Sequence, residues 1–478
     1  MTAARMSVDS VRFYMRNVRT RMPFKYGVAV LTSVPILHVV VEATVENKSV
    51  RGMAADILPP KWFDKDPQKD YAANVDDLLF AAQTAADAYA MAGRSPHPFF
   101  SLWRTGYEAT LSAGDARGLN HLTAGHGSSL MERALIDACG RGVELSYFDL
   151  VRTNVLGLDL GDLHGELAGV EPRRALADRP LQSISVRHTV GLADPIFSTD
   201  IPKEEVLSDG LPQSLQSYIE MQHVAYFKVK VNGNAEADGQ RLAAIAALLD
   251  ERAGAYHVTL DGNEQYADMD SFSALLDHIE TTLPAFWSRI LYVEQPLERS
   301  VALNDELAEG IRAADARKPM LVDESDGDLD TFVRAMEIGY SGISSKACKG
   351  LVKAIANAAL ARLRDPSRYF LTGEDLMNLP IVPLHQDLAH LAALGIAHAE
   401  RNGHHYVRGL AHLSDSERTA CLTGHGDLYT ESDGLAALSI ANGQLTVGSL
   451  QCPGLGVAAE IDVDSMVPLE EWSFDSLA

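Results

Sequence analysis

The second part of this 478-residue sequence repeats one pattern: a short apolar run, a polar residue, and then a stretch with helical spacing. The first two runs are residues 183–190 and 225–231. The later runs end near Asp261, Glu294, Asp323, Lys346, Thr372 and Glu400. These ends lie about 30 residues apart, which is the length of one βα unit. Eight such units predict a closed (β/α)₈ barrel of about 250 residues, although an open doubly wound sheet gives the same alternation.

The residues before this repeat have a different texture. Apolar residues alternate with others over 37–45, which predicts a strand, and residues 59–63 predict a loop. Residues 77–91 and 130–138 have helical spacing, and Gly140 is expected to end the second helix. We therefore predict an α/β protein with an N-terminal α+β domain over 1–150, a linker over 151–182, the barrel over 183–430 and a C-terminal segment over 431–478.

Composition excludes several classes of partner. The formal net charge of −24 argues against a nucleic-acid partner, because phosphate binding requires clustered Lys and Arg. No run approaches the roughly 18 apolar residues of a membrane span, and the first residues do not resemble a secretory signal. The four cysteines are scattered, as is typical of reduced thiols. We expect a cytoplasmic protein that has neither a membrane nor a nucleic-acid partner.

Carboxylates follow three consecutive strands of the predicted barrel. Strand three ends at Asp261, strand four at Glu294 and strand five at Asp323. Active sites of such barrels lie at the C-terminal ends of the strands, so these side chains are expected to share one cleft. Three carboxylates in one cleft stay ionised only beside a cation. Hard oxygen ligands select Mg²⁺, with Mn²⁺ as the alternative, so Asp261, Glu294 and Asp323 are the predicted metal ligands.

Lysines flank the same predicted cleft. Lys228 and Lys230 share the inward face of strand two, because side chains alternate along a strand, and Lys346 ends strand six. A lysine beside a divalent cation has a lowered pKa and can act as a general base. Strands two and six lie on opposite sides of a barrel, so Lys230 and Lys346 can address opposite faces of a carbon atom. These groups suit removal of the proton next to a carboxylate, where the cation stabilises the enolate.

Together these motifs resemble the enolase superfamily, and within it the muconate lactonizing enzyme-like subgroup. The matching strings are the Lys-x-Lys of strand two, the three carboxylates, residues 294–296, 323–325, 346–350 and, near the end, 453–457. The resemblance covers 183–460 well and the earlier residues more loosely. No histidine follows strand seven, which separates the chain from the mandelate racemase branch.

The resemblance carries implications for fold and site. It implies that residues 1–150 form a capping domain and that the C-terminal segment returns to this cap. Asp261, Glu294 and Asp323 would bind Mg²⁺, and Lys230 and Lys346 would be the acid/base pair. Lys228 would hold the substrate carboxylate or tune Lys230, and Glu400 would lie near the substrate. Relatives of this kind are commonly homo-oligomers.

The implied reaction is α-proton abstraction from a small carboxylate substrate. Racemisation or epimerisation, dehydration and cycloisomerisation share this first step, and the sequence does not choose among them. Two alternatives belong to other classes: a metal-dependent barrel aldolase or hydrolase, and a metal-binding homologue without turnover.

Several other residues have simpler interpretations. Lys349 is expected to be structural, His404 and His405 to form a loop pair with structural contacts, and Glu374 with Asp375 to be solvated or to cap a loop. Tyr26 and Trp62 lie in loops that, by the resemblance, can close over the site.

Overall fold

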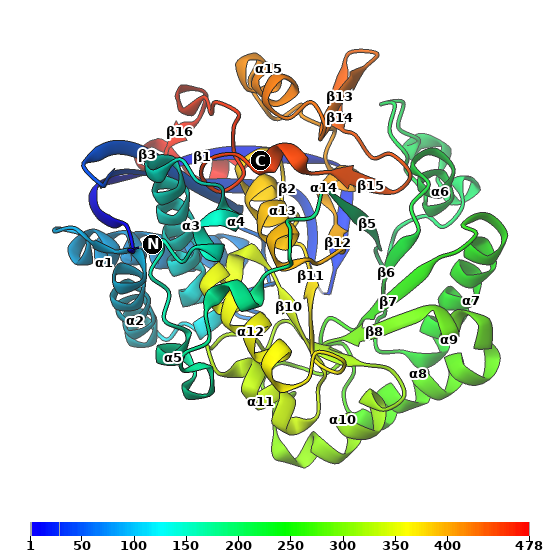
Figure 1. Cartoon of the computed structure of the whole chain (residues 1–478). Coiled ribbons are helices and arrows are strands. Elements are labelled where there is room, and N and C mark those ends of the chain that lie inside the picture. The colour runs from blue at the N-terminus through cyan, green and yellow to red at the C-terminus, as the bar shows by residue number, and fades with distance from the viewer. Residues whose placement is uncertain (1, 28, 478) are drawn as a thin grey trace.

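The computed structural model describes residues 2–27 and 29–477 and shows a cap packed on a barrel (Figure 1). The cap sheet is antiparallel, in the order β16-β1-β2-β3, with β4 pairing to β1. Its main strands are β1 (Arg5–Tyr26), β2 (Ala29–Val45) and β3 (Lys48–Ile57), and β4 is His97–Pro98. The helices α1 (Tyr71–Ala92), α2 (Phe99–Arg117) and α3 (His121–Val143) follow.

In the described part of the chain, eight parallel strands close into the barrel, because β12 pairs with β5. They are β5 (Ser183–Val190), β6 (Tyr226–Lys230), β7 (His257–Asp261), β8 (Ile290–Glu294), β9 (Met320–Val322), β10 (Gly342–Ser345), β11 (Phe370–Gly373) and β12 (His398–Arg401). The predicted barrel is therefore confirmed, and the open sheet is excluded, since an open sheet has no pairing between its first and last strands.

Helices follow the strands around the barrel, as expected for βα units. Those of the barrel are α7 (Ala235–Arg252), α8 (Met269–Thr282), α9 (Pro284–Arg289), α10 (Ala308–Asp315), α11 (Thr331–Ile338), α12 (Leu351–Arg364) and α13 (Val382–Leu394). The remaining helices are α4 (Tyr147–Arg152), α5 (Leu160–Leu163), α6 (Leu215–Gln222), α14 (Gly403–Tyr406) and α15 (Asp415–Gly424). None of the helices that the structure describes is long and apolar enough to span a bilayer.

The C-terminal segment contacts both parts of the molecule. It forms the hairpin β13 (Tyr429–Ser432) and β14 (Leu435–Leu438), then β15 (Gln444–Thr446) and β16 (Val467–Pro468). The strand β15 pairs with β5 of the barrel, whereas β16 pairs with β1 of the cap. The chain thus returns to the cap only after adding one antiparallel strand beside the barrel. The predicted boundaries between the four segments, after residues 150, 182 and 430, stay predictions.

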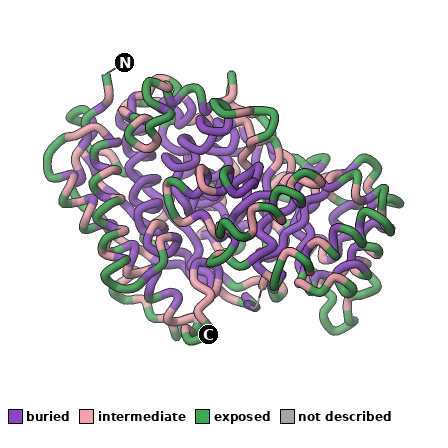
Figure 2. The backbone as a smooth tube through the Cα atoms, turned by 90° about the horizontal axis from the view of Figure 1, so that it is seen from below, coloured by how far each residue is buried: buried purple, intermediate pink, exposed green. Residues whose placement is uncertain are grey.

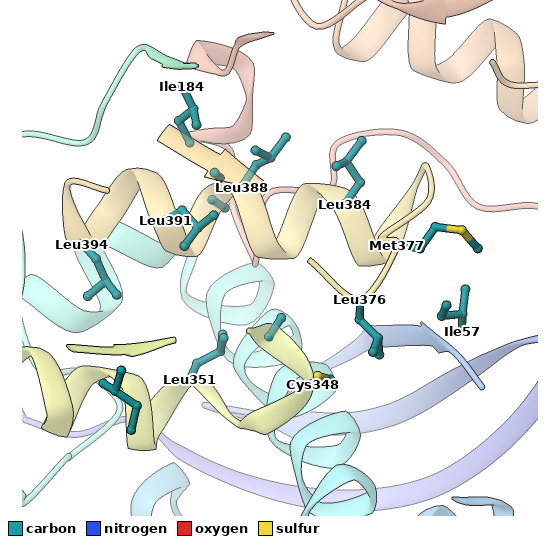
Figure 3. Packing of buried hydrophobic residues seen from close by; sticks show 14 of the residues in the cluster. Ile57, Ile184, Cys348, Leu351, Leu376, Met377, Leu384, Leu388, Leu391 and Leu394 are labelled. Carbon is teal, nitrogen blue, oxygen red and sulfur yellow. The ribbon is translucent and has the colours of Figure 1, made fainter. Parts of the chain in front are cut away.

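Two helices are buried along nearly their whole length because they lie between layers. Most of α3 is buried, and every residue of α13 is. Leu384, Leu388, Leu391 and Leu394 run along α13 at the spacing of one helical face (Figure 3). One apolar core extends from the cap strands into the barrel, and the buried tube in Figure 2 shows this continuity.

The prediction that Gly140 ends a helix is wrong. The helix α3 continues to Val143, and Glu144 provides the left-handed residue that caps it. A Cβ at Gly140 would lie 2.7 Å from the Cα of Gly454. Glycine is required here because the C-terminal segment crosses the helix at backbone contact, not because the helix stops.

Glu132 of α3 joins the cap to the barrel. Its carboxylate accepts hydrogen bonds from the first backbone N–H groups of α12, at Leu351 and at Val352 (2.8 Å), and from Nε1 of Trp103 (2.6 Å). Burial raises the pKa of Glu132 to about 7, although these hydrogen bonds oppose the shift. The contact fixes the start of α12, which directly follows the Lys346–Gly350 segment.

We expect Glu132→Ala to lower the free energy of unfolding by about 3 kcal/mol at acidic pH, because it leaves buried donors without an acceptor. The pKa of Glu132 in the folded protein lies above its ordinary value of 4.5. The stability that the native side chain contributes is therefore fully present below pH 4.5 and is lost as the pH rises through about 7. Denaturant melts at several pH values test this. Glu108→Ala, at an exposed position of α2, is the control and should change little.

Candidate active site

The predicted site residues meet at the C-terminal end of the barrel because of strand register. Lys230 of β6 is directly paired with Asp261 of β7, which is paired with Glu294 of β8. Asp323 and Lys346 directly follow β9 and β10. All five side chains are buried, and their order around the barrel follows their order in the sequence. The structure therefore brings together the residues that the sequence selected.

Lys228 lies at the centre of this cluster. Its Nζ is 2.9 Å from Oδ2 of Asp261, 2.7 Å from Oε2 of Glu294, 2.7 Å from Oε2 of Glu374 and 2.9 Å from Oε2 of Glu400. Burial disfavours the ammonium, but the four carboxylates outweigh burial and raise the pKa of Lys228 well above its ordinary value. Lys228 is therefore a fixed positive charge shared by four strand ends.

Glu294 is the least compensated carboxylate of the cluster. Neither of its oxygens has a hydrogen-bond partner, and the Lys228 ammonium supplies its ion-pair contact. Burial, followed by repulsion from Asp261 and Glu374, raises the pKa of Glu294 well above its ordinary value. A buried carboxylate without hydrogen bonds is costly unless cations compensate its charge, and here one ammonium is shared among four carboxylates.

Asp323 is held by two lysines. Its Oδ2 lies 2.5 Å from Nζ of Lys346, and its Oδ1 lies 2.8 Å from Nζ of Lys349. Ser344 donates a hydrogen bond to Oδ1 as well. Burial alone would raise the pKa of Asp323, but Lys346 and Lys349 outweigh it and hold the pKa well below the ordinary value.

The two predicted acid/base lysines reach one pocket. Lys230 donates to Oδ2 of Asp261 (2.5 Å) and to Oδ1 of Asn263 (2.8 Å). Nζ of Lys346 lies 4.3 Å from the ring centroid of Trp62, a cation–π contact contributed by the cap. Both lysines line one pocket between the cap and the barrel. In the metal-free protein burial would lower the pKa of Lys346, but Asp323 outweighs burial and raises it. The lowering expected beside a bound divalent cation stays a prediction.

Glu400 of β12 also lines the pocket. Its carboxylate accepts from Oγ1 of Thr189 (2.8 Å), from Lys228 and from the backbone N–H of Asp375 (3.0 Å). Burial favours its neutral form, but Lys228 and Lys230 hold its pKa well below the ordinary value. Its place beside the pocket agrees with the position expected from the resemblance, and contact with substrate stays a prediction.

The expectation that Glu374 is solvated is wrong. Glu374 is fully buried and binds Lys228 and the guanidinium of Arg187 from β5. Asp375 does cap a loop, because it accepts from the backbone N–H groups of Asn378 (2.7 Å) and Asn402 (2.8 Å). The signal for Glu374 was present, since it follows the end of strand seven as the other carboxylates follow their strands. Arg187 could have been found from the inward face of strand one.

Other expectations concern residues around the pocket. Tyr26 and Trp62 both line it. Lys349 is buried and binds Asp323, so its structural interpretation gains a specific partner. The pair His404 and His405 lies in the short helix α14 and not in a loop, but it does have structural contacts. Nε2 of His404 lies 3.2 Å from Nδ1 of His188, and Nδ1 of His405 lies 2.6 Å from the hydroxyl of Tyr218.

The carboxylates fit a hard divalent cation by their chemistry. Among residues 2–27 and 29–477, no three acidic, His or Cys side chains form a ready-made metal site. The reason is visible in the ion pairs: Lys228 stands between Asp261 and Glu294, and Lys346 and Lys349 hold Asp323. Neither oxygen of Glu294 has a hydrogen-bond partner, and the Lys228 ammonium that contacts Oε2 is shared with three other carboxylates, so a further cation would stabilise this carboxylate. Asp261, Glu294 and Asp323 therefore remain the predicted ligands.

Solved structures of enolase-superfamily enzymes have the same architecture. A muconate lactonizing enzyme from Pseudomonas fluorescens, complexed with muconolactone, superposes with a TM-score of 0.59 at 16% identity, over 95% of this chain and 97% of that one. An N-succinyl Arg/Lys racemase from Bacillus cereus gives 0.62 at 15% identity, over 96% of both chains. A dipeptide epimerase from Enterococcus faecalis, complexed with Mg and a dipeptide, gives 0.60 at 15% identity, over 94% and 99%.

This chain has the fold of these enzymes. The resemblance noted in the sequence is therefore confirmed at the level of fold, from the cap through the barrel. No model of a protein family matches the sequence, and no curated protein is similar to it. At this level of identity the likeness establishes the fold alone, so the reaction has to be argued from the site.

Proposed function

We propose that this protein removes the α-proton of a carboxylate substrate and returns a proton to the same carbon from the opposite side, as a racemase or epimerase. The observation that carries the proposal is that Lys230 and Lys346, from β6 and β10, line one pocket above a cluster of buried carboxylates. The racemase and epimerase activities named for structural neighbours support the same class of reaction.

The chain supplies the proton-transfer groups. One lysine, as the free amine, takes the α-proton and becomes an ammonium, while the C–H electron pair passes into the enolate of the carboxyl group. The other lysine, as the ammonium, gives its proton to the opposite face of the same carbon. Proton count and charge balance in one turnover, which leaves the two lysines with exchanged protonation states; proton exchange with water or the reverse reaction restores them. No redox partner is required.

Asp261, Glu294 and Asp323 would hold a Mg²⁺ ion. When bound, such an ion stabilises the second negative charge of the enolate and weakens the hold of the carboxylates on the lysine ammonium groups. The ammonium of Lys228 lies within 2.9 Å of the carboxylates of Glu294, Glu374 and Glu400. Its positive charge reduces their repulsion of an incoming substrate carboxylate. Trp62 covers Lys346 and restricts water access to it.

Hydrogen exchange in deuterated water tests the proposal. Chiral 2-substituted carboxylates would be incubated with the protein and Mg²⁺, and loss of the α-proton signal followed by NMR. We expect exchange accompanied by inversion for at least one compound, and dependence on added Mg²⁺. Release of aldehyde or hydrolysis products without α-exchange would instead support an aldolase or hydrolase.

A further inference from the structure

Much of the pocket wall is apolar. The cap contributes Phe24, Ile57 and Trp62, and the loop after β11 contributes Leu376 and Met377. Figure 3 shows Ile57 of the cap beside Leu376 and Met377 of the barrel loop, which lie on the same pocket. Hydrocarbon from two separate domains thus faces the reacting groups, so the body of a bound substrate would be buried against it.

Polar atoms in this wall are largely occupied. The hydroxyl of Tyr26 donates to the carbonyl of Pro60 (2.7 Å), and Asp375 accepts from backbone N–H groups. Oδ1 of Asn402 is buried without a hydrogen-bond partner. This free atom is an acceptor, which suits a neutral donor such as a hydroxyl and repels an anion.

Positive charge is confined to the reacting end of the pocket. Among the described lining residues, the cations are Lys230 and Lys346, and each already pairs with a carboxylate, Asp261 or Asp323. Two carboxyl groups, those of Asp375 and Glu400, line the same pocket. A second anionic group on the substrate would therefore meet no free partner.

Two cations that contact lining residues, Lys65 at Asn263 and Arg299 at Trp62, are also committed. Lys65 binds Glu264, and Arg299 forms an ion pair with the same carboxylate (2.8 Å). Arg299 also donates hydrogen bonds to the backbone carbonyls of Trp62 and Phe63 (both 2.9 Å). It therefore holds in place the loop that carries Trp62. Burying an unpaired carboxylate against such a wall is strongly unfavourable.

We propose that the substrate is a monocarboxylate whose body is an uncharged hydrocarbon group, and that the pocket rejects a second anionic group. This inference rests on the proposed function for the placement of the reacting carboxylate at the lysine end. The proposed substrate thereby differs from compounds with two carboxylates, such as the N-succinyl Arg or Lys named for one structural neighbour.

A pair of isosteric acids tests the inference. In 2-hydroxy-4-methylpentanoate an isopropyl group occupies the position that a carboxylate occupies in malate. Calorimetric titration of the Mg²⁺-loaded protein should show the branched hydroxy acid binding at least a hundredfold more tightly than malate. Equal or tighter binding of malate would overturn the inference, as would failure of both acids to bind at 10 mM.

A charge placed in the wall provides an independent test. Met377→Lys keeps an unbranched side chain, longer by one atom, and adds a cation, and Met377→Leu is the uncharged control. We expect the lysine variant to shift the binding ratio toward malate by at least tenfold, and the leucine variant to leave it within threefold. An unchanged ratio in Met377→Lys would contradict the proposal. The readout of both tests is binding. A protein that binds the two acids selectively but shows no α-proton exchange would refute the proposed reaction and leave the proposed substrate specificity standing.

Discussion

Replacing either lysine of the acid/base pair should abolish exchange of one substrate enantiomer and spare the other. In Lys230→Met and in Lys346→Met, the enantiomer whose α-proton faces the missing amine should exchange about a thousandfold more slowly, the size of effect that a general base supplies. The opposite enantiomer should still exchange, with retention, because the remaining lysine both removes and returns the proton. Racemisation should be lost in both variants.

The measurement is NMR-detected α-exchange of each pure enantiomer in deuterated water. Lys203→Met, at an exposed position, is the control and should exchange both enantiomers as the wild type does. If both site variants lost exchange of the same enantiomer, Lys230 and Lys346 would not lie on opposite sides of the α-carbon. If both variants kept full racemisation, neither lysine would be catalytic.

Removal of the central ammonium should have the largest effect on stability. In Lys228→Met, the carboxylates of Asp261, Glu294, Glu374 and Glu400 lose their shared cation. We expect the free energy of unfolding of the metal-free protein to fall by about 3–5 kcal/mol at neutral pH, as is typical when one partner of a buried charge cluster is removed. Added Mg²⁺ should recover more stability in the variant than in the wild type, because it replaces the missing charge.

Denaturant unfolding with and without Mg²⁺ measures both effects. The pKa of Lys228 in the folded protein lies above its ordinary value of 10.5. Its contribution to stability is therefore fully present below pH 10.5 and is lost only as the pH rises through the pKa of the folded protein. Lys228→Arg keeps the charge and should lose less stability than Lys228→Met. Unchanged stability of the methionine variant at pH 7 would mean that this ammonium does not hold the cluster together.

The sequence predicted the barrel and its reacting end because both follow from local rules. Each strand end could be placed from the apolar runs, and register then brought Lys230, Asp261 and Glu294 into one row. Alternation along strand two correctly placed Lys228 and Lys230 on one face, since both reach carboxylates of the cluster.

Contacts between distant segments could not be predicted in the same way. Trp62 meets Lys346, and Glu132 meets the start of α12, only because the cap docks on the barrel. The role of Gly140 depends on the returning C-terminal segment. Glu374 was missed for a different reason. A carboxylate beside a turn is usually solvated, and this general tendency was preferred to its position at the end of strand seven, where Arg187 and Lys228 bind it.

Diffraction from crystals soaked with Mn²⁺, recorded for its anomalous signal, would locate the metal ion. We expect one strong manganese peak bound by the carboxylates of Asp261, Glu294 and Asp323, with Lys230 and Lys346 on either side of it. A peak bound by other side chains, or no peak at this end of the barrel at millimolar Mn²⁺, would contradict the proposed metal-assisted proton transfer.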